Sequence, residues 1–456
     1  MKKRMFSVTL VRGLSVLVGA MAIAAVLYGC GGGNDAAVNP TVAAVNPTIA
    51  PVEPTVAPID LTFSVAVIGD SPYGIAYGDT AQYLANPAFI AKVNADTSLS
   101  AALHVGDIHS GKEFCTETYN LGVFNQWKTG YTKLPLIYTP GDNEWTDCHK
   151  AKEGGGTYNT STFVIDYVTK DGGSYANGDP LANLTLIRSI FFPAPGKSLG
   201  SGMSLHSQAL EFDPAHPADA QFVENVWFEK NGVLFFNINI PGGSNNDDDN
   251  WYGTPTKSNA QAQEVAARTA ANLRWIDAAF AKAIANKNVG VVIQVQADMW
   301  DQDGSPAGKA HLTNYKQFID KIASNTTAFA KPVLLVNGDS HTYRSDNPLV
   351  PNATCVAEKP VTAVVGAPLV PATSAVACSD ASVASVMATY HADSPGTTDP
   401  YANQPNGYNV TNFHRVVVHT NPANPQEYLK LSIDPSVNAA NGSTAFGPFS
   451  WKRIAP

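Results

Sequence analysis

Four Gly-Asp pairs that directly follow short apolar runs supply the side chains best suited to chemistry in this chain. The runs end in V-I-G-D, L-H-V-G-D, T-P-G-D and L-V-N-G-D, and their carboxylates belong to Asp70, Asp107, Asp142 and Asp339. Runs rich in Val, Ile and Leu predict buried strands. Because ligands of an open α/β sheet bind where its strands end, we expect the four aspartates at one such edge.

Aspartates grouped in this way favour a bound cation. Ionised carboxylates a few ångströms apart raise each other's pKa, and a metal ion offsets that repulsion. Clusters of oxygen ligands suit Mg, Ca or Mn. The alternative is that each Asp only caps a helix or a turn after its strand. Capping is the better explanation of a single Gly-Asp pair, whereas the repetition of the pair at four strand ends favours the metal site.

The pattern of apolar residues predicts alternating strands and helices between residues 61 and 350, which indicates an α/β fold built from βαβ units. A polar, Gly-rich segment at 153–183 is expected to be an insertion. The loop at 242–250 carries three successive aspartates and is either a solvated loop or a rim of the site. Residues 351–456 are predicted to be a small β-rich extension. Strands are expected at 63–68, 102–105, 134–138, 232–240, 289–295, 333–336, 413–419 and 427–433, and helices at 86–93, 119–128, 258–286 and 312–322.

The first residues are typical of an export signal. Lys2, Lys3 and Arg4 precede an uncharged apolar segment at 13–27, which is too short for a comfortable membrane span. The segment ends in L-Y-G-C, which resembles the bacterial lipoprotein box and predicts a signal peptide at 1–29 with a lipid on Cys30. An ordinary signal peptide with an incidental cysteine is the alternative. Gly31 favours the outer membrane. The Pro-rich repeats up to residue 60 predict an extended tether.

The remaining four cysteines are an even number in an exported chain, which is consistent with two disulfides. We pair Cys115 with Cys148 and Cys355 with Cys378, although three connectivities are formally possible. A Cys/His metal site is the weaker alternative, because no C-x-x-C is present. The formal net charge of −9 argues against stable nucleic-acid binding.

The order of the Gly-Asp motifs resembles that of the calcineurin-like metallophosphoesterases, a resemblance that covers roughly residues 63–344. G-D, G-D-x-x-x-G, G-D-N-E and G-D-S-H follow one another, and the helix with L-R-W-I-D precedes the strand at 289–295. The resemblance implies a four-layer α/β/β/α sandwich over residues 61–350 and a centre with two metal ions. One metal would be held by Asp70, Asp107 and His341. The other would be held by Asp107, Asp142, Asp339 and Gln296, for whose position Asp298 competes.

Departures from the family pattern shift the expected metal chemistry. Pro72 and Asp339 stand where the family has His, which favours Mg, Mn or Ca over Zn or Fe. Asn143 replaces the His that assists the leaving group and cannot donate a titratable proton. His109 and His149 are possible substitutes, although a surface role is the simpler interpretation of each.

The resemblance predicts an exported phosphoesterase that hydrolyses a small phosphomonoester or phosphodiester, or acts on a phosphorylated surface molecule, with catalytic roles for Asn143, His341 and Arg344. Arg344 could hold a phosphoryl oxygen, or form a structural ion pair. A second hypothesis is a catalytically impaired relative that serves as a binding or scaffold lipoprotein. A third, a carbohydrate- or surface-binding module, has only the aromatic loops at Trp145, Trp251 and Trp300 in its favour.

Overall fold

The computed structural model describes residues 61–168, 175–300, 306–350, 353–359, 375–383, 408–420 and 426–455. The predicted signal peptide, Cys30 and the tether therefore lie outside the described residues. Within the described residues, no helix is both long and apolar enough to cross a membrane.

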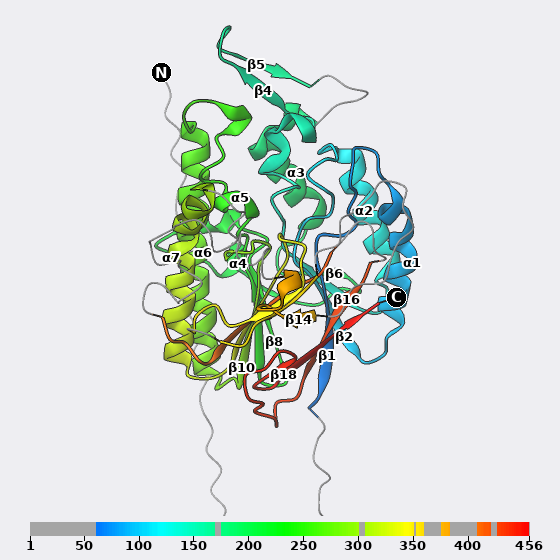
Figure 1. Cartoon of the computed structure of the whole chain (residues 1–456), viewed down its shortest axis with the longest axis vertical. Coiled ribbons are helices and arrows are strands. Elements are labelled where there is room, and N and C mark those ends of the chain that lie inside the picture. Colours follow the sequence, from blue (N-terminus) through cyan, green and yellow to red (C-terminus); the bar gives the residue numbers. More distant parts are fainter. Residues whose placement is uncertain are drawn as a thin grey trace, which may run out of the picture. The chain divides into compact units, whose positions relative to one another are not determined.

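Two large mixed sheets with helices on both sides make the chain a mixed α/β protein (Figure 1). The first sheet has seven strands in the order β17-β18-β16-β1-β2-β3-β6, and β1, β2 and β3 are parallel. Its strands are β1 (Phe63–Ile68), β2 (Leu99–His104), β3 (Pro135–Tyr138), β6 (Leu199–Gly200), β16 (Tyr428–Ile433), β17 (Ala445–Phe446) and β18 (Phe449–Ile454).

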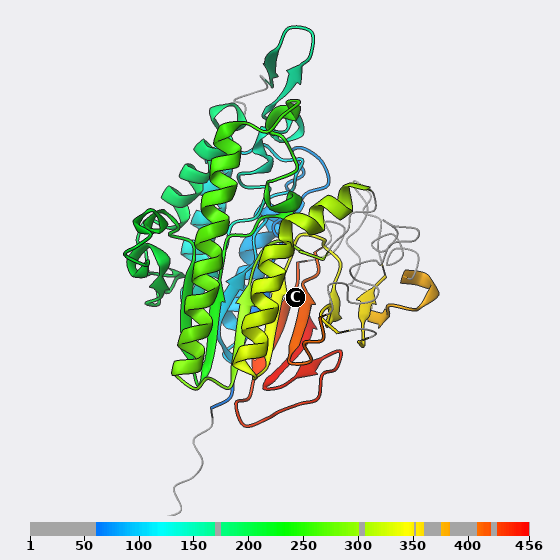
Figure 2. The same ribbon diagram turned by 90° about the vertical axis from the view of Figure 1, so that its left-hand side faces the viewer.

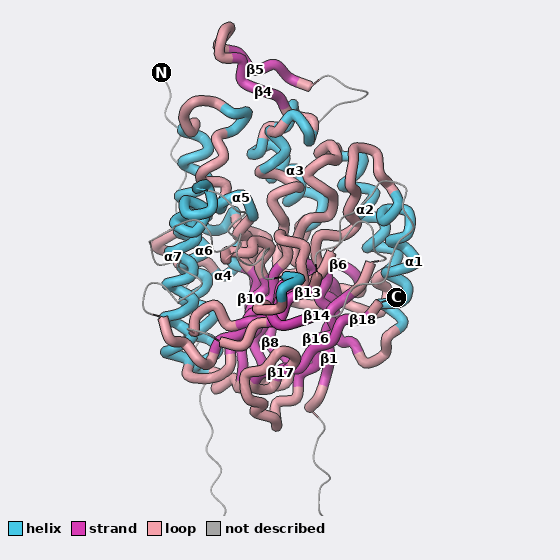
Figure 3. Tube along the Cα trace, viewed as in Figure 1, coloured by secondary structure: helices cyan, strands magenta, loops and turns pink. Residues whose placement is uncertain are grey.

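The second sheet has nine strands in the order β14-β13-β12-β15-β11-β10-β9-β8-β7, with a parallel centre formed by β9, β10, β11 and β15. Its strands are β7 (His206–Ser207), β8 (Val226–Lys230), β9 (Val233–Asn237), β10 (Gly290–Gln294), β11 (Val333–Asn337), β12 (Arg344–Asp346), β13 (Val356–Glu358), β14 (Ala375–Ala377) and β15 (Phe413–Val417). In Figure 3 the strands of both sheets lie between two groups of helices. The helices are α1 (Ala81–Ala95), α2 (Glu117–Gly130), α3 (Pro180–Phe191), α4 (Gln208–Glu211), α5 (Gly242–Asn245), α6 (Asn259–Ala285) and α7 (Pro306–Phe329).

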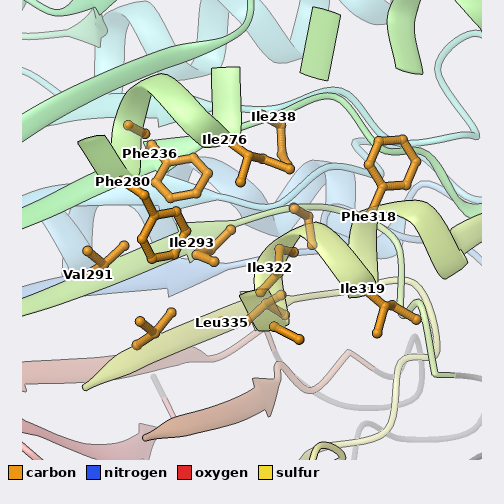
Figure 4. Close-up of a cluster of buried hydrophobic side chains, with 14 of the residues drawn as sticks. Phe236, Ile238, Ile276, Phe280, Val291, Ile293, Phe318, Ile319, Ile322 and Leu335 are labelled. Carbon is orange, nitrogen blue, oxygen red and sulfur yellow. The ribbon is translucent and has the colours of Figure 1, made fainter. Parts of the chain in front are cut away.

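Three hydrophobic clusters hold these elements together. One contains side chains of both sheets, such as Val67 and Leu103 of the first and Phe235 and Val336 of the second. Another joins the seven-stranded sheet to α1, α2 and α3. The third packs α6 and α7 on the nine-stranded sheet (Figure 4). The two long helices run side by side along that face (Figure 2). Burying apolar area at about 25 cal/mol per Å² makes these interfaces the main source of stability.

Helix α1 begins earlier than its sequence pattern predicts, and Pro87 lies inside it rather than near its start. Proline has no N–H, so the carbonyl of Tyr83 loses its usual helical donor. That carbonyl accepts a hydrogen bond from the side chain of Gln126 in α2 (3.1 Å). A contact between two helices therefore offsets the defect, which the local sequence could not reveal.

The C-terminal strands are integral parts of the two sheets, and this differs from the predicted boundary at residue 350. β15 lies between β11 and β12, and β16 pairs along β1 with Leu431 opposite Val65. A strand carries the same alternating or buried pattern whichever partner it has, so the sequence could not show this long-range pairing. The predicted insertion contains a hairpin, β4 (Gly156–Asn159) and β5 (Val164–Tyr167), whose strands form a separate two-stranded sheet (Figure 1).

Candidate functional site

The candidate site lies where the parallel strands of both sheets end. Asp70, Asp107 and Asp142 follow β1, β2 and β3 of the first sheet, whereas Asp339 and His341 follow β11 of the second. The backbone N–H of Asp339 donates to Oδ1 of Asp70 (2.8 Å), which joins the two sheets at this point. The expectation of a single sheet edge was therefore too simple, because two sheets supply the aspartates.

The predicted metal ligands form two groups that share one carboxylate. Asp70, Asp107 and His341 form one group, and Asp107, Asp142 and Asp339 form the other. Within each group, the potential ligand atoms lie within 4.8 Å of one another. Asp107 belongs to both groups. This is the arrangement in which one carboxylate could bridge two cations.

In two of the four Gly-Asp pairs, glycine makes room for the carboxylate of another strand end. A Cβ atom added to Gly141 would lie 1.9 Å from Oδ1 of Asp107, and one added to Gly338 would lie 2.3 Å from Oδ2 of Asp70. Either contact is far inside van der Waals distance, so a side chain at these positions would displace one of these carboxylates. Gly141 and Gly338 are thus packing requirements of the cluster, whereas a Cβ at Gly69 would meet Val105 (2.3 Å) and one at Gly106 would meet Gln296 (2.7 Å).

Four of the clustered residues have a left-handed backbone. The φ angles of Asp70, Asp107, Asp339 and His341 are 49°, 55°, 73° and 62°. Positive φ is uncommon for residues other than glycine, and such residues concentrate at functional sites where the surrounding structure holds them. Hydrogen bonds supply that restraint, because Asp70 N–H donates to the carbonyl of Gly106 (2.9 Å).

The cluster contains buried polar atoms that lack a hydrogen-bond partner among the described residues. They are Oδ2 of Asp70, Oδ1 of Asp107 and Nε2 of His341. Such atoms are costly unless something satisfies them. Carboxylate oxygens with a single imidazole are a donor set for hard divalent cations, so these residues fit the predicted metal ions.

Burial and mutual repulsion perturb the carboxylates. Burial, followed by the charges of Asp142 and Asp70, raises the pKa of Asp107 well above its usual range. Burial and the charge of Asp147 raise the pKa of Asp142 to about 6. Two or more negative charges in this volume are therefore unfavourable without a compensating positive charge.

Glu144 holds the loops of Asp107 and Asp142 together. Its carboxylate accepts hydrogen bonds from the backbone N–H groups of Ile108 (3.0 Å) and Gly141 (3.1 Å) and from the hydroxyl of Tyr138 (2.8 Å). Burial raises its pKa to about 7. Glu144 therefore supports the site through the backbone.

Gln296, expected from the sequence as a further ligand, forms a hydrogen bond with Asp142, one of the clustered aspartates. Its Nε2 donates to Oδ1 of Asp142 (2.9 Å), and its Oε1 accepts from the N–H of Gly242. The amide thus orients Asp142 and ties it to the loop at 242–250. Gly242 itself borders the cluster, since an added Cβ would lie 2.6 Å from Asp339 and 2.7 Å from Asp142.

The loop at 242–250 combines the two roles considered from the sequence, a rim of the site and an acidic surface loop. Its beginning is a rim of the site, and residues 243–246 form a left-handed turn with φ between 57° and 61°. Two of its three aspartates form ion pairs with lysines, Asp247 with Lys257 and Asp249 with Lys150. The loop therefore contributes its backbone to the site and its charges to ion pairs.

Asp298 and Arg344 belong to a buried ion-pair network behind the cluster. The Asp298 carboxylate accepts from Arg344 (3.0 Å), Arg415 and Ser340 (2.8 Å), while its backbone N–H donates to Oδ2 of Asp339 (3.1 Å). The arginines hold the pKa of Asp298 below its usual range despite burial. The structure thus places Arg344 in a structural ion pair, the alternative considered from the sequence, and its partner there is Asp298.

The two histidines considered as proton donors are buried, in contrast to the expected surface positions. Nδ1 of His109 donates to the carbonyl of Ser110 (3.0 Å), and burial lowers the pKa of His109 to about 4. His149 accepts from the N–H of Tyr252 (2.9 Å). With Asp147 and Asp249 it forms a third acidic group, but the Lys150 ammonium lies 2.6 and 2.8 Å from those carboxylates. A lysine therefore already supplies the positive charge there.

Sequence reasoning missed two residues that contact the site, Tyr73 and His104. The Tyr73 ring meets His341 edge-on, with 4.5 Å between ring centroids. His104 donates from Nε2 to the carbonyl of Ser71 (2.8 Å) and accepts at Nδ1 from the N–H of Gly106 (3.3 Å). It thereby connects the loops of Asp70 and Asp107. The only available signal was their position, within three residues of a predicted ligand.

Both predicted disulfides are present, Cys115–Cys148 and Cys355–Cys378. Asn143 lies beside the first of them and is buried, and its amide donates to the carbonyl of His109 (3.0 Å) and the hydroxyl of Tyr73 (3.4 Å). Comparison with models of protein families and with curated protein sequences gave no match to this chain.

Proposed function

We propose that this chain is an exported, metal-dependent phosphoesterase of the calcineurin-like metallophosphoesterase type, with a four-layer α/β/β/α arrangement. It would hydrolyse a small phosphomonoester or phosphodiester, or act on a phosphorylated surface molecule. The observation that carries the proposal is the position of Asp107 in both ligand groups. The unpartnered buried oxygens and the left-handed ligands support it.

Two divalent cations would supply Lewis-acid polarisation of a phosphoryl oxygen and a lowered pKa of bound water. Asp70, Asp107 and His341 would hold one cation, and Asp107, Asp142 and Asp339 the other. Gln296 and Glu144 would keep these carboxylates in place through the hydrogen bonds described above. The carboxylate-rich donor set favours Mg, Mn or Ca over Zn or Fe.

The export proposal rests on the N-terminal sequence, and the two disulfides agree with an oxidising compartment. A lipid on Cys30 would attach the protein to a bacterial membrane, with the outer membrane favoured, and the acidic chain is not expected to bind nucleic acid.

A second candidate is a relative that binds a cation and a phosphorylated ligand without turnover. The specific observation in its favour is Asn143, which is buried and has both amide hydrogens engaged. Such a residue cannot transfer a proton to a leaving group.

Metal content and hydrolysis measured on the same purified protein separate these candidates. The proposal expects bound Mg, Mn or Ca, and turnover of an aryl phosphodiester that the Asp107→Asn variant loses together with the metal. Asp249→Asn is the matched control, because its carboxylate lies outside both groups and is 41% exposed. Metal without turnover would favour the binding protein, and no metal under any condition would refute both.

A further inference from the structure

Solvent reaches the ligand cluster from the side of His341 and Tyr73. The side chain of Asp70 is fully buried, whereas that of His341 is 32% exposed. Tyr73 is also partly exposed, and its ring covers one edge of the His341 imidazole. A ligand that approaches the cluster from this side would meet Tyr73 next to the metal ligands.

The hydrogen bond of Tyr73 leaves its own proton available. The Asn143 amide donates to the phenolic oxygen (3.4 Å), so the hydroxyl acts as the acceptor in the hydrogen bond it makes among the described residues. The other amide hydrogen of Asn143 is donated to the carbonyl of His109. Asn143 therefore has no donor left for a ligand, whereas Tyr73 has one.

The Tyr73 hydroxyl keeps its proton at physiological pH. A tyrosine hydroxyl ordinarily has a pKa of about 10, so a neutral O–H lies beside the cluster. A neutral donor is useful there, because it can approach an oxygen that gains charge without competing with the cations for the carboxylates.

We infer that Tyr73 is the hydrogen-bond donor to the leaving-group oxygen of the phosphoester, held in place by Asn143. This rests on the proposed function. The oxygen of the attacking water bonds to phosphorus and releases its proton to solvent, while the phosphorus–oxygen bond to the leaving group breaks. Charge builds up on the departing oxygen, and the Tyr73 O–H stabilises it by a hydrogen bond. The departing oxygen finally takes its proton from solvent, and Tyr73 keeps its own.

The test compares Tyr73→Phe with wild type on phosphodiesters whose leaving groups range from nitrophenol to an alkyl alcohol. We expect a loss of at most about threefold for the nitrophenyl ester, rising to about 10- to 100-fold for the alkyl ester, the range for a hydrogen bond to a charged oxygen. Inorganic phosphate should bind the metal-loaded variant about fivefold more weakly by calorimetry, while metal content stays unchanged.

Tyr77→Phe is the matched control, since Tyr77 is 49% exposed in the same loop and its ring packs on Phe114 (4.3 Å between centroids). An equal loss along the whole ester series, or unchanged phosphate affinity, would overturn the assignment of Tyr73 alone. A wild type that binds metal but hydrolyses no ester would overturn the proposed function, and phosphate affinity would then still decide whether Tyr73 contacts the ligand.

Discussion

Cys115 and Cys148 join the loop that carries Asp107 to the loop that carries Asp142. Their sulfur atoms lie 3.3 and 3.5 Å from the carbonyl oxygen of Asn143, next to Asp142 in the chain. The disulfide is fully buried. It therefore restrains the backbone of two proposed ligands of the same cation.

The two disulfides should contribute similarly to stability but differently to metal binding. They close segments of 33 and 23 residues, for which loop-closure entropy gives about 3–4 kcal/mol each. We expect Cys115→Ser/Cys148→Ser and Cys355→Ser/Cys378→Ser to lower the free energy of unfolding by comparable amounts. Only the first pair should also weaken Mn²⁺ binding, by about tenfold, as measured by calorimetry at a temperature where both variants are folded. Equal metal affinity in the two variants would contradict this prediction.

Most elements around the site could be predicted from the sequence because each has a local signal. Apolar runs marked β1, β2, β3 and β11, and α6 begins after Ser258, whose side chain caps it by accepting from Gln261 N–H. The repeated Gly-Asp pairs indicated which residues would meet. Family resemblance then placed Asp107 in both groups.

Long-range pairing and side-chain direction could not be predicted in this way. β15 enters the centre of the second sheet, and no local pattern identifies its neighbours. Gln296 and Asp298 both follow β10, but one touches Asp142 and the other touches two arginines. The packing of the two sheets decides which of these side chains faces the cluster. It also decides the position of Tyr73 against His341.

Replacing Asp107 by Asn should stabilise the metal-free protein. Its raised pKa means that the ionised carboxylate is penalised in the folded state, so this contribution destabilises the fold at every pH above the unfolded value. Asparagine removes the charge and tolerates the left-handed backbone at this position. We expect the free energy of unfolding in EDTA to rise by about 0.5–2 kcal/mol, a usual gain when a functional residue is neutralised.

With divalent cations present, wild type should be more stable than Asp107→Asn, the reverse of their order in EDTA. Wild type at a Mn²⁺ concentration 100 times its dissociation constant should gain about 2.7 kcal/mol, and Asp107→Asn should gain almost nothing. Urea unfolding with EDTA and with Mn²⁺ measures both. A variant that is destabilised in EDTA would show that the carboxylate has a structural partner.

His104 should make stability fall in mild acid. Burial lowers its pKa from 6.5 to about 4, so between these values the unfolded chain binds a proton that the folded chain does not. Stability should therefore drop by about 1.4 kcal/mol per pH unit as the pH falls from 6.5 towards 4. Asp142, with its pKa raised to about 6, acts in the opposite direction over part of this range.

Comparison of wild type with His104→Gln separates the effect of His104 on the pH dependence of stability from the effect of Asp142. In EDTA, the stability advantage of wild type over the variant should shrink at the predicted slope below pH 6.5, as measured by urea unfolding between pH 7 and pH 5. His216→Gln, a change at an exposed position, is the matched control. A constant difference across this range would mean that His104 does not stay neutral in the fold.

Replacing Arg344 distinguishes a structural role of this residue from a role in substrate binding. Its side chain is 3% exposed and bonds to Asp298, which also binds Arg415 and donates its backbone N–H to Asp339. Removing one member of a buried ion-pair network typically costs 3–5 kcal/mol because a charge is left without compensation. We therefore expect Arg344→Met to lower the free energy of unfolding by about that amount and to reduce metal affinity through Asp339.

A role of Arg344 in substrate binding predicts instead normal stability and a raised KM for the phosphoester. Unfolding and kinetics of the same variant distinguish these results, and the double variant Arg344→Met/Asp298→Leu should recover part of the lost stability if the cost comes from the stranded carboxylate.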